Sequence, residues 1–196
     1  MKNLALTFVV AALIGLAFTN PNETATYKVD NTNSTVVWKG YKVTGSHTGT
    51  IAMKSGELDF KKGKLKGGKF EIDMTSIIVT DLEGEYKGKL EGHLKSADFF
   101  GVEENPTATF ETTSVMAGET ANSYNVKGNL TIKGITNEIS FVAIVDDTKT
   151  PIETTAAIKV DRSKFDVRYG SGSFFENLGD KTIYDEFDLE VKLVTK

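Results

Sequence analysis

The chain of 196 residues contains no cysteine. Disulfide bridges, thiol nucleophiles and zinc-cysteine sites are therefore excluded. It has only two histidines, and carboxylates that would complete a metal site with them cannot be placed, so we expect no metal and no other cofactor. Basic side chains are not in excess either. The formal net charge of −4 gives no reason to expect nucleic acid as a partner.

The sequence also lacks the usual signatures of catalysis. No serine lies in a Gly-x-Ser-x-Gly elbow before a helix, and the Gly-Ser run at residues 170–173 has no Asp-His partners in evidence. The same run lacks the Lys-Ser/Thr ending of a nucleotide-binding loop. An enzyme would have to depend on His93 with a carboxylate, so we expect a protein without catalytic activity.

Only one long hydrophobic run is present, at residues 4–18, and it follows Lys2. Its 15 residues are short for a membrane span, which needs about 20, but fit the apolar part of a secretory signal. We predict a signal peptide at residues 1–19 and an exported domain at 20–196, periplasmic or secreted, with no stable membrane span after cleavage. A retained signal anchor is the alternative. No cysteine follows, so a lipoprotein anchor is not expected.

Composition and alternation predict an all-β domain. Eighteen glycines and 12 phenylalanines against 4 methionines are typical of many strands and tight turns. Residues 69–77 alternate cleanly, with Phe70, Ile72 and Met74 on one face. Strands are expected at residues 34–43, 49–60, 69–77, 107–115, 124–133, 135–146, 154–160 and 182–194. Eight strands with one apolar face each form a sandwich or a barrel, and alternation alone does not distinguish a packed core from a cavity.

One short helix is expected, at about residues 82–96. Leu82, Tyr86, Leu90, His93 and Leu94 recur at helical spacing and form one stripe. Asp81 precedes the stripe, where an N-cap acceptor belongs. Residues 97–101 then follow as a loop with two adjacent aromatic side chains. A single helix in a chain of strands is expected to cover part of the sheet.

Four motifs resemble the YceI-like family. Residues 92–110 (GHLKSADFFGVEENPTATF) are similar to its signature segment, in which a His-Leu pair precedes a loop, two aromatics and a proline before an Ala-Thr-Phe strand. Residues 27–49, 126–135 (VKGNLTIKGI) and 161–165 (DRSKF) agree with the family in the expected order. The resemblance covers about residues 26–195.

The resemblance implies a lipocalin-like, elongated antiparallel β-barrel that encloses a hydrophobic channel. Family members hold polyisoprenoid or other long amphiphilic lipids, are usually periplasmic or secreted, and some are dimers, so a homodimer is a further expectation. We therefore predict an exported, non-catalytic protein that binds a polyisoprenoid or fatty-acyl amphiphile for transport or storage. Two alternatives stay open: a filled barrel that serves as a structural or interaction protein of the cell envelope, and an enzyme that acts on an isoprenoid-like lipid.

The predicted lining consists of large apolar side chains of alternating strands together with side chains of the helix region. The strand candidates are Trp38, Ile51, Met53, Phe70, Ile72, Met74, Phe110, Val126, Phe187, Leu189 and Val191. The helix region adds Leu90, His93, Phe99 and Phe100. Each of these could equally be an ordinary core residue, because methionine and phenylalanine suit cores as well as adaptable channels.

Three side chains are candidates for contact with a ligand head group: His93, Arg162 and Arg168. Histidine side chains in general titrate near neutrality, so His93 could bind a head group or respond to pH. Its alternative role is a buried histidine bonded to a backbone carbonyl. Arg162 and Arg168 surround a turn beside the flexible Gly-Ser run and could meet a phosphate or carboxylate. Alternatively, Arg162 belongs to a solvated turn and pairs with a neighbouring aspartate.

Overall fold

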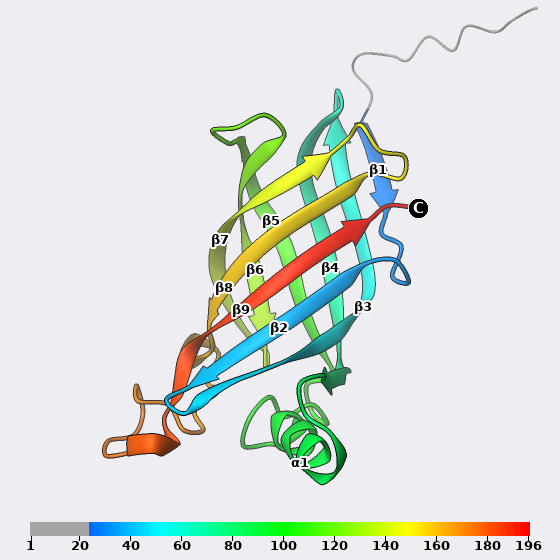
Figure 1. Ribbon diagram of the computed structural model, residues 1–196. Helices are drawn as coiled ribbons and strands as arrows, with labels where there is room; N and C mark the ends of the chain where they lie inside the picture. The colour runs from blue at the N-terminus through cyan, green and yellow to red at the C-terminus, as the bar shows by residue number, and fades with distance from the viewer. Residues whose placement is uncertain (1–23) are drawn as a thin grey trace, which may run out of the picture.

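The computed structural model describes residues 24–196 (Figure 1). The predicted signal peptide, residues 1–19, lies outside the described residues. The described chain forms one sheet of nine strands and one α-helix. The strands are β1 (Thr24–Lys28), β2 (Thr35–Lys42), β3 (Gly45–Lys61), β4 (Lys64–Val79), β5 (Thr107–Ala117), β6 (Ser123–Ile132), β7 (Ile135–Asp146), β8 (Glu153–Asp161) and β9 (Ile183–Val194).

The sheet closes into a barrel. Its strand order is β1-β3-β2-β9-β8-β7-β6-β5-β4, and an additional pairing of β3 with β4 joins the ends, so β2 to β9 form a ring of eight antiparallel strands. β1 lies outside this ring and pairs only with residues 57–61 of β3. Closure leaves few free edges. The predicted eight-stranded antiparallel barrel is confirmed, and β1 is an addition that the sequence did not signal.

The barrel is elongated because several of its strands are long. β3 has 17 residues and β4 has 16, so each extends for about 50–55 Å at the usual rise of a β-strand. Alternation sets their faces: in β9, Phe187, Leu189 and Val191 point inward, while Glu190 and Lys192 are exposed. The polar outer face and apolar inner face follow directly from this period of two.

The helix α1 (Gly84–Lys95) lies across one end of the barrel, below the end of β4 (Figure 1). A carboxylate oxygen of Glu91 accepts a hydrogen bond from the N–H of Val79 at 2.8 Å, which ties the helix to that strand. The expected apolar stripe is wrong in part, since no residue of α1 is buried and Tyr86 is 75% exposed. The helix touches the barrel along one edge only, so a full apolar face has nothing to cover.

The predicted N-cap is also wrong. Glu83 occupies the N-cap position and makes no side-chain cap bond. Asp81 instead accepts hydrogen bonds from His47 Nδ1 at 2.9 Å and from the N–H of Thr48 at 3.1 Å. Burial raises the pKa of Asp81, but the hydrogen bonds that it accepts from His47 and from backbone N–H groups, of Thr48 above all, together leave that pKa below its ordinary value. Asp81 therefore joins the start of β3 to the chain entering α1.

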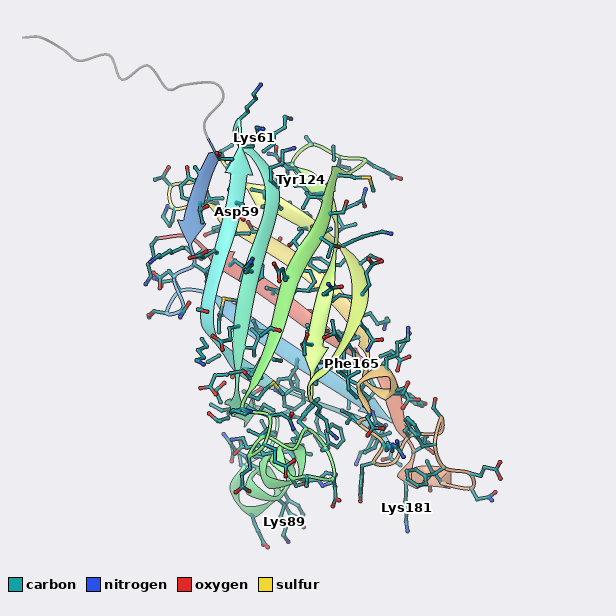
Figure 2. The ribbon with its side chains drawn as sticks, turned by 180° about the vertical axis from the view of Figure 1, so that it is seen from behind. Asp59, Lys61, Lys89, Tyr124, Phe165 and Lys181 are labelled. Atoms are coloured by element: carbon teal, nitrogen blue, oxygen red, sulfur yellow. The ribbon has the colours of Figure 1, made fainter. Side chains whose placement is uncertain are left out.

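A second segment, residues 162–182, covers the same end of the barrel. It contains the 3-10 turns η1 (Arg162–Phe165) and η2 (Gly179–Lys181). Phe165 and Val167 of this segment are almost fully buried, at 1% and 0% exposure. Figure 2 shows Lys89 of α1 and Lys181 of η2 at this end, and Lys61 and Tyr124 at the other. We call these the capped end and the hairpin end.

Separate apolar clusters occupy the two halves of the barrel. Towards the hairpin end, Leu58, Phe60 and Leu65 are buried with Val145 and Leu193. Towards the capped end, the cluster contains the buried side chains Met74, Ile77, Phe99, Val102, Ala108, Ile132, Val160, Phe165 and Val167. Ile51, Ile72 and Leu189 pack against both clusters. Residues of both clusters line the interior cavity of the barrel.

Candidate functional site

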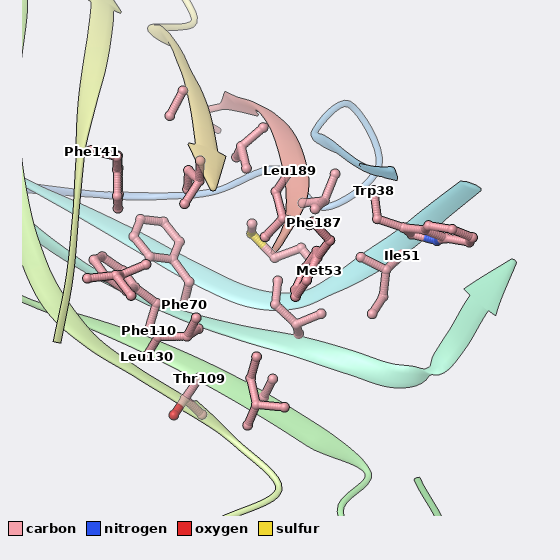
Figure 3. Close-up of a pocket in the computed structure, with 18 of the residues that line it drawn as sticks. Trp38, Ile51, Met53, Phe70, Thr109, Phe110, Leu130, Phe141, Phe187 and Leu189 are labelled. Carbon is pink, nitrogen blue, oxygen red and sulfur yellow. The ribbon is translucent and has the colours of Figure 1, made fainter. Parts of the chain in front are cut away.

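The barrel encloses a cavity of about 230 Å³ (Figure 3). All eight strands of the ring contribute side chains to its wall, and α1, the loop after it and η1 add one or two residues each. The wall is almost wholly apolar, with threonine and tyrosine as its main polar residues and Arg162 as its one charged residue. A cavity with such a wall suits an apolar ligand and gains little from a polar one.

Inward-facing aromatic side chains keep accessible surface, which shows that the barrel is hollow. Phe70, Phe110 and Phe141 all line the cavity, yet each is only half-buried. Their rings form a row, with centroid distances of 6.3 Å between Phe70 and Phe110 and 5.4 Å between Phe110 and Phe141. In a filled barrel these rings would be close-packed. The cavity therefore argues against the alternative of a barrel whose interior is filled by side chains.

Thirteen of the fifteen predicted lining residues do line the cavity. They are Trp38, Ile51, Met53, Phe70, Ile72, Met74, Phe99, Phe100, Phe110, Val126, Phe187, Leu189 and Val191. Leu90 does not line it: it is half-buried on α1, and Leu94 is the helix residue that reaches the cavity. The reason is the shallow contact of the helix with the barrel, which brings only its last turn over the opening.

His93 does not line the cavity either. Its ring packs edge-on against Tyr169 at 4.3 Å and Phe99 at 5.5 Å between centroids. Its Nε2 atom is buried and has no hydrogen-bond partner among the described residues. The predicted contact with a ligand and the predicted bond to a backbone carbonyl are therefore both unsupported by the geometry. His93 instead joins α1 to the segment that carries Tyr169.

Sequence reasoning missed several lining residues on β6, β7 and β8, among them Leu130, Ile139, Phe141 and Ile158. Residues 139–145 are apolar on both faces, so alternation could not assign their direction. The pairing of β6 with β7 could have assigned the inward face, because Phe141 lies directly opposite Val126, which was predicted to point inward. Cross-strand partners share a face of the sheet.

Arg162 is the one charged side chain of the wall, and it is almost fully buried. It donates hydrogen bonds to three backbone carbonyls, from Nε to Tyr184 (3.2 Å) and from its two terminal nitrogens to Val167 (2.8 Å) and Ile183 (2.9 Å). Its guanidinium also lies 5.3 Å from the ring centroid of Phe99. The predicted solvated turn is therefore wrong: Arg162 fastens η1 to the start of β9.

The charge of Arg162 is balanced by a partly buried carboxylate. Asp185 Oδ1 lies 3.5 Å from Arg162 and has no hydrogen-bond partner among the described residues. Burial lowers the pKa of Arg162, and the nearby carboxylates of Asp185 and Asp161 oppose that shift. Three of the five N–H donors of a guanidinium are bonded to backbone carbonyls here, and a terminal nitrogen also faces Asp185 Oδ1.

Arg168, the other predicted head-group residue, faces solvent. Its side chain is 58% exposed and pairs with the carboxylate of Asp166. Its guanidinium lies 5.0 Å from the ring centroid of Phe174, which is outside the cavity. Arg168 is thus separated from Arg162 although the two are close in sequence, because the αL residue Asp166 reverses the chain between them.

Two further polar atoms of the wall are buried without partners among residues 24–196: Trp38 Nε1 and Thr154 Oγ1. Trp38 lies towards the capped end, and Thr154 lies towards the hairpin end. Unpartnered buried polar atoms are rare in folded proteins. These two are therefore the polar atoms of the wall that lack a partner in the described chain.

In the described part of the chain, no group of three or more histidine, aspartate or glutamate side chains could hold a metal ion. No helix of residues 24–196 is long and apolar enough to cross a membrane.

A closed antiparallel barrel with an apolar cavity is the architecture of proteins that enclose one small ligand. The model of the YceI-like domain family matches residues 27–195, and the chain belongs to this family.

Named relatives match shorter stretches. A UPF0312 protein of Pseudomonas aeruginosa is 47% identical over 51 residues, which is 26% of each chain. A UPF0312 protein of Azotobacter vinelandii is 30% identical over 96 residues, 48% of this chain and 47% of the relative. One from Staphylococcus aureus is 57% identical over 70 residues, 36% and 37% of the two chains. The matches thus span about a quarter to a half of the length of these relatives.

Solved structures share the fold over most of the chain. Burkholderia cenocepacia BcnA matches with a TM-score of 0.69 and 24% identity, covering 86% of this chain and 99% of its own. A polyisoprenoid binding domain from Saccharophagus degradans matches with a TM-score of 0.62 and 14% identity, covering 87% and 97%. At these identities the likeness shows the fold alone, and it agrees with the lipocalin-like barrel predicted from the sequence.

Proposed function

We propose that this protein binds a long amphiphilic lipid, of polyisoprenoid or fatty-acyl type, in the barrel cavity and carries or stores it outside the cytoplasm. The observation that carries the proposal is the apolar cavity, which draws on all eight strands of the barrel. The Saccharophagus degradans protein of the same fold, described as a polyisoprenoid binding domain, supports the ligand class.

The energetics favour such a ligand. Each CH₂ group that leaves water for an apolar wall contributes about 0.8 kcal/mol, so a chain of isoprene or acyl units needs no specific polar partner to bind well. Specificity then comes from the length of the cavity and from its few polar atoms.

The polar atoms of the wall favour an uncharged head group that accepts hydrogen bonds. Trp38 Nε1 is a donor of the wall without a partner in the described chain, and Asp185 already balances the charge of Arg162. A diphosphate would bring at least two negative charges into this wall with no free cation to meet them, and burying an unpaired charge is strongly unfavourable. An alcohol, ketone or amide would be accommodated.

Binding without catalysis is the second part of the proposal. The residues that line the cavity include no histidine, aspartate, glutamate, lysine or cysteine. These are the side chains that most often act as general acids, bases or nucleophiles. Tyr41 and Tyr184 are the wall residues that could transfer a proton, and the Tyr41 hydroxyl is already bonded to Asp188 at 2.6 Å.

Export to the periplasm or the medium is proposed on the sequence of residues 1–19, and N-terminal sequencing of the purified protein would check it. The predicted homodimer stays a prediction that sedimentation velocity would test.

Trp38 provides a direct test because it is the single tryptophan of the chain and lines the cavity. A polyprenol or a long-chain fatty amide, titrated into the delipidated protein, should change the intensity or wavelength of its fluorescence in a saturable way. The corresponding polyprenyl diphosphate should bind at least about tenfold more weakly. Organic extraction and mass spectrometry of the protein from its native compartment should yield a co-purified lipid near one per chain. Failure of both uptake and co-purification would overturn the proposal.

A further inference from the structure

Exposed aromatic side chains gather at the capped end of the barrel. Of the six exposed aromatic residues in the described chain, four lie within residues 169–184: Tyr169, Phe174, Phe175 and Tyr184. Their exposed fractions are 49%, 40%, 50% and 51%. Both exposed phenylalanines of residues 24–196 are in this group, which we call the aromatic tip. Large apolar side chains are rarely left in water together without a partner.

The aromatic tip is held in place by hydrogen bonds. Ile183 donates its N–H to the carbonyl of Gly170 at 2.8 Å, and Ser173 donates its hydroxyl to Asp185 Oδ2 at 2.6 Å. Ser171 is fully buried at the base of the loop. The segment also rests on the buried Arg162, which holds the carbonyls of Val167 and Tyr184. The exposure of Phe174 and Phe175 is therefore a property of an ordered loop.

The aromatic tip adjoins the cavity. Tyr184 belongs to both, since it contributes to the cavity wall and exposes 51% of its surface, and its neighbour Ile183 also lines the cavity. Wall residues are buried at both ends, as Leu58 (3%) at the hairpin end and Ile77 (3%) at the capped end show, and Tyr184 is the aromatic wall residue that also reaches the outer surface. The apolar surface thus continues from the interior to the exterior at the capped end.

Charge at the aromatic tip is close to balanced. Residues 164–185 contain three basic side chains (Lys164, Arg168, Lys181) and four acidic ones (Asp166, Glu176, Asp180, Asp185), a sum of −1. A surface built to attract anionic lipid would carry an excess of lysine and arginine. Phenylalanine and tyrosine side chains, by contrast, favour the boundary between lipid head groups and acyl chains whatever the head-group charge.

We propose that the aromatic tip docks the protein onto a lipid bilayer surface, so that the capped end of the cavity faces the source or destination of its ligand. This inference rests on the proposed function, because a cavity that carries a membrane lipid must exchange it with a bilayer. Phe174 and Phe175 enter the interface, Tyr169 and Tyr184 lie at head-group depth, and the barrel stays in water.

The test compares binding to neutral phosphatidylcholine vesicles, measured by flotation, for the wild-type protein and the double variant Phe174→Ser/Phe175→Ser. The wild type should float with the vesicles at low and at high salt, since balanced charge makes binding insensitive to ionic screening. The double variant should bind about tenfold more weakly, because two half-exposed rings are lost from the interface. A matched control is Met116→Ser/Ile144→Ser, which removes two exposed apolar side chains (56% and 53%) towards the hairpin end and should bind like the wild type.

A second measurement separates this inference from the proposed function. Ligand supplied from ethanol should change Trp38 fluorescence equally in the wild type and in the double variant, whereas ligand supplied from vesicles should load the double variant more slowly. Uptake from ethanol without vesicle binding by the wild type would overturn the docking proposal and leave the proposed function intact. Equal flotation of wild type and double variant would overturn it as well. So would a wild-type dimer that becomes a monomer in the double variant, because the tip would then be an interface between copies.

Discussion

Trp38 and Gly49 face each other across β2 and β3, and the indole lies over the glycine. A Cβ at position 49 would lie 2.5 Å from Cζ2 of Trp38 and would overlap the carbonyl oxygen of Ile78. Glycine is therefore required there so that the ring can lie flat against the inner wall.

We predict that Gly49→Ala destabilises the protein by about 1–3 kcal/mol, the usual effect of overpacking. Urea denaturation followed by Trp38 fluorescence measures this directly. Gly88→Ala is the control, because a Cβ at that exposed helix position meets nothing within 4 Å and alanine favours helix. A stable Gly49→Ala variant with unchanged fluorescence would show that the indole does not depend on this contact.

Arg162 should be essential for folding of the capped end. Its replacement by alanine leaves Asp185 Oδ1 and three backbone carbonyls without Arg162, and removing one member of a buried ion pair typically destabilises by about 3–5 kcal/mol. The urea midpoint of Arg162→Ala should fall accordingly. Arg168→Ala, which breaks an exposed pair, should change stability by less than about 1 kcal/mol. Similar midpoints for the two variants would contradict the assigned role of Arg162.

Two adjacent alanines of β8 distinguish the cavity from the outer surface. Ala156 lines the cavity, and Ala157 is exposed on the opposite face. Ala156→Phe should fill part of the 230 Å³ space and lower ligand affinity at least about tenfold, because each methylene displaced from the wall removes close to 0.8 kcal/mol.

Ala157→Phe adds the same ring outside and should bind ligand normally, as measured by fluorescence titration. Equal binding by the two variants would show that the ligand does not occupy this cavity.

Asp188 of β9 links β2 and β8 through its carboxylate, and we expect low pH to weaken this link. Its carboxylate accepts hydrogen bonds from the Tyr41 hydroxyl at 2.6 Å and from Lys159 Nζ at 3.0 Å, and these hold the pKa of Asp188 below its ordinary value. Because the folded pKa is lowered, this stabilisation is complete above the ordinary aspartate pKa of about 3.9. It is lost as the pH falls through the lower, folded value.

Asp188→Asn should therefore be less stable than the wild type at pH 7, by less than about 1 kcal/mol because the side chain is partly exposed. The two proteins should converge at the lowest pH. Urea midpoints measured from pH 7 to pH 2.5 check this, and a constant difference across that range would exclude the assigned cause.

His93 should be replaceable without loss of stability. Its Nε2 is buried without a partner in the described chain, and its ring makes only edge contacts with Phe99 and Tyr169. His93→Phe keeps a flat ring and removes the unpaired polar atom, which should leave stability unchanged or raise it by about 1 kcal/mol. A marked loss of thermal stability would show that Nε2 has a partner, such as an ordered water.

The inner wall of the barrel was predictable to the extent that its strands alternate. Phe70, Ile72 and Met74 of β4 and Phe187, Leu189 and Val191 of β9 have polar neighbours on both sides, so a period of two assigned them inward. The method failed on β7, where Phe141 faces inward and Val142 outward with 49% exposure. When an outward-facing residue such as Val142 is also apolar, inward and outward positions of the strand no longer differ in polarity, and alternation cannot assign its faces.

The helix region shows a different limit. Periodicity placed a helix at about residues 82–96, close to the observed α1, but it assigned its stripe to a buried face. How much of a helix is buried depends on what it rests on, and α1 rests on the rim of a barrel. Leu94, Phe99 and Phe100 therefore reach the cavity, whereas Leu90 and Tyr86 do not.

Alternation and composition by themselves determined about eight strands, each with one apolar face, and the absence of cysteine chemistry, because these are local properties of the chain. The choice of a barrel over a sandwich came from the resemblance of four motifs to the YceI-like family. Only the tertiary structure decided that the barrel is hollow, that Arg162 is neutralised by Asp185 inside it while Arg168 stays in solvent, and that four aromatic side chains gather at its capped end. Those features depend on distances between segments far apart in the chain, and such distances are fixed by how the ring closes rather than by any local pattern.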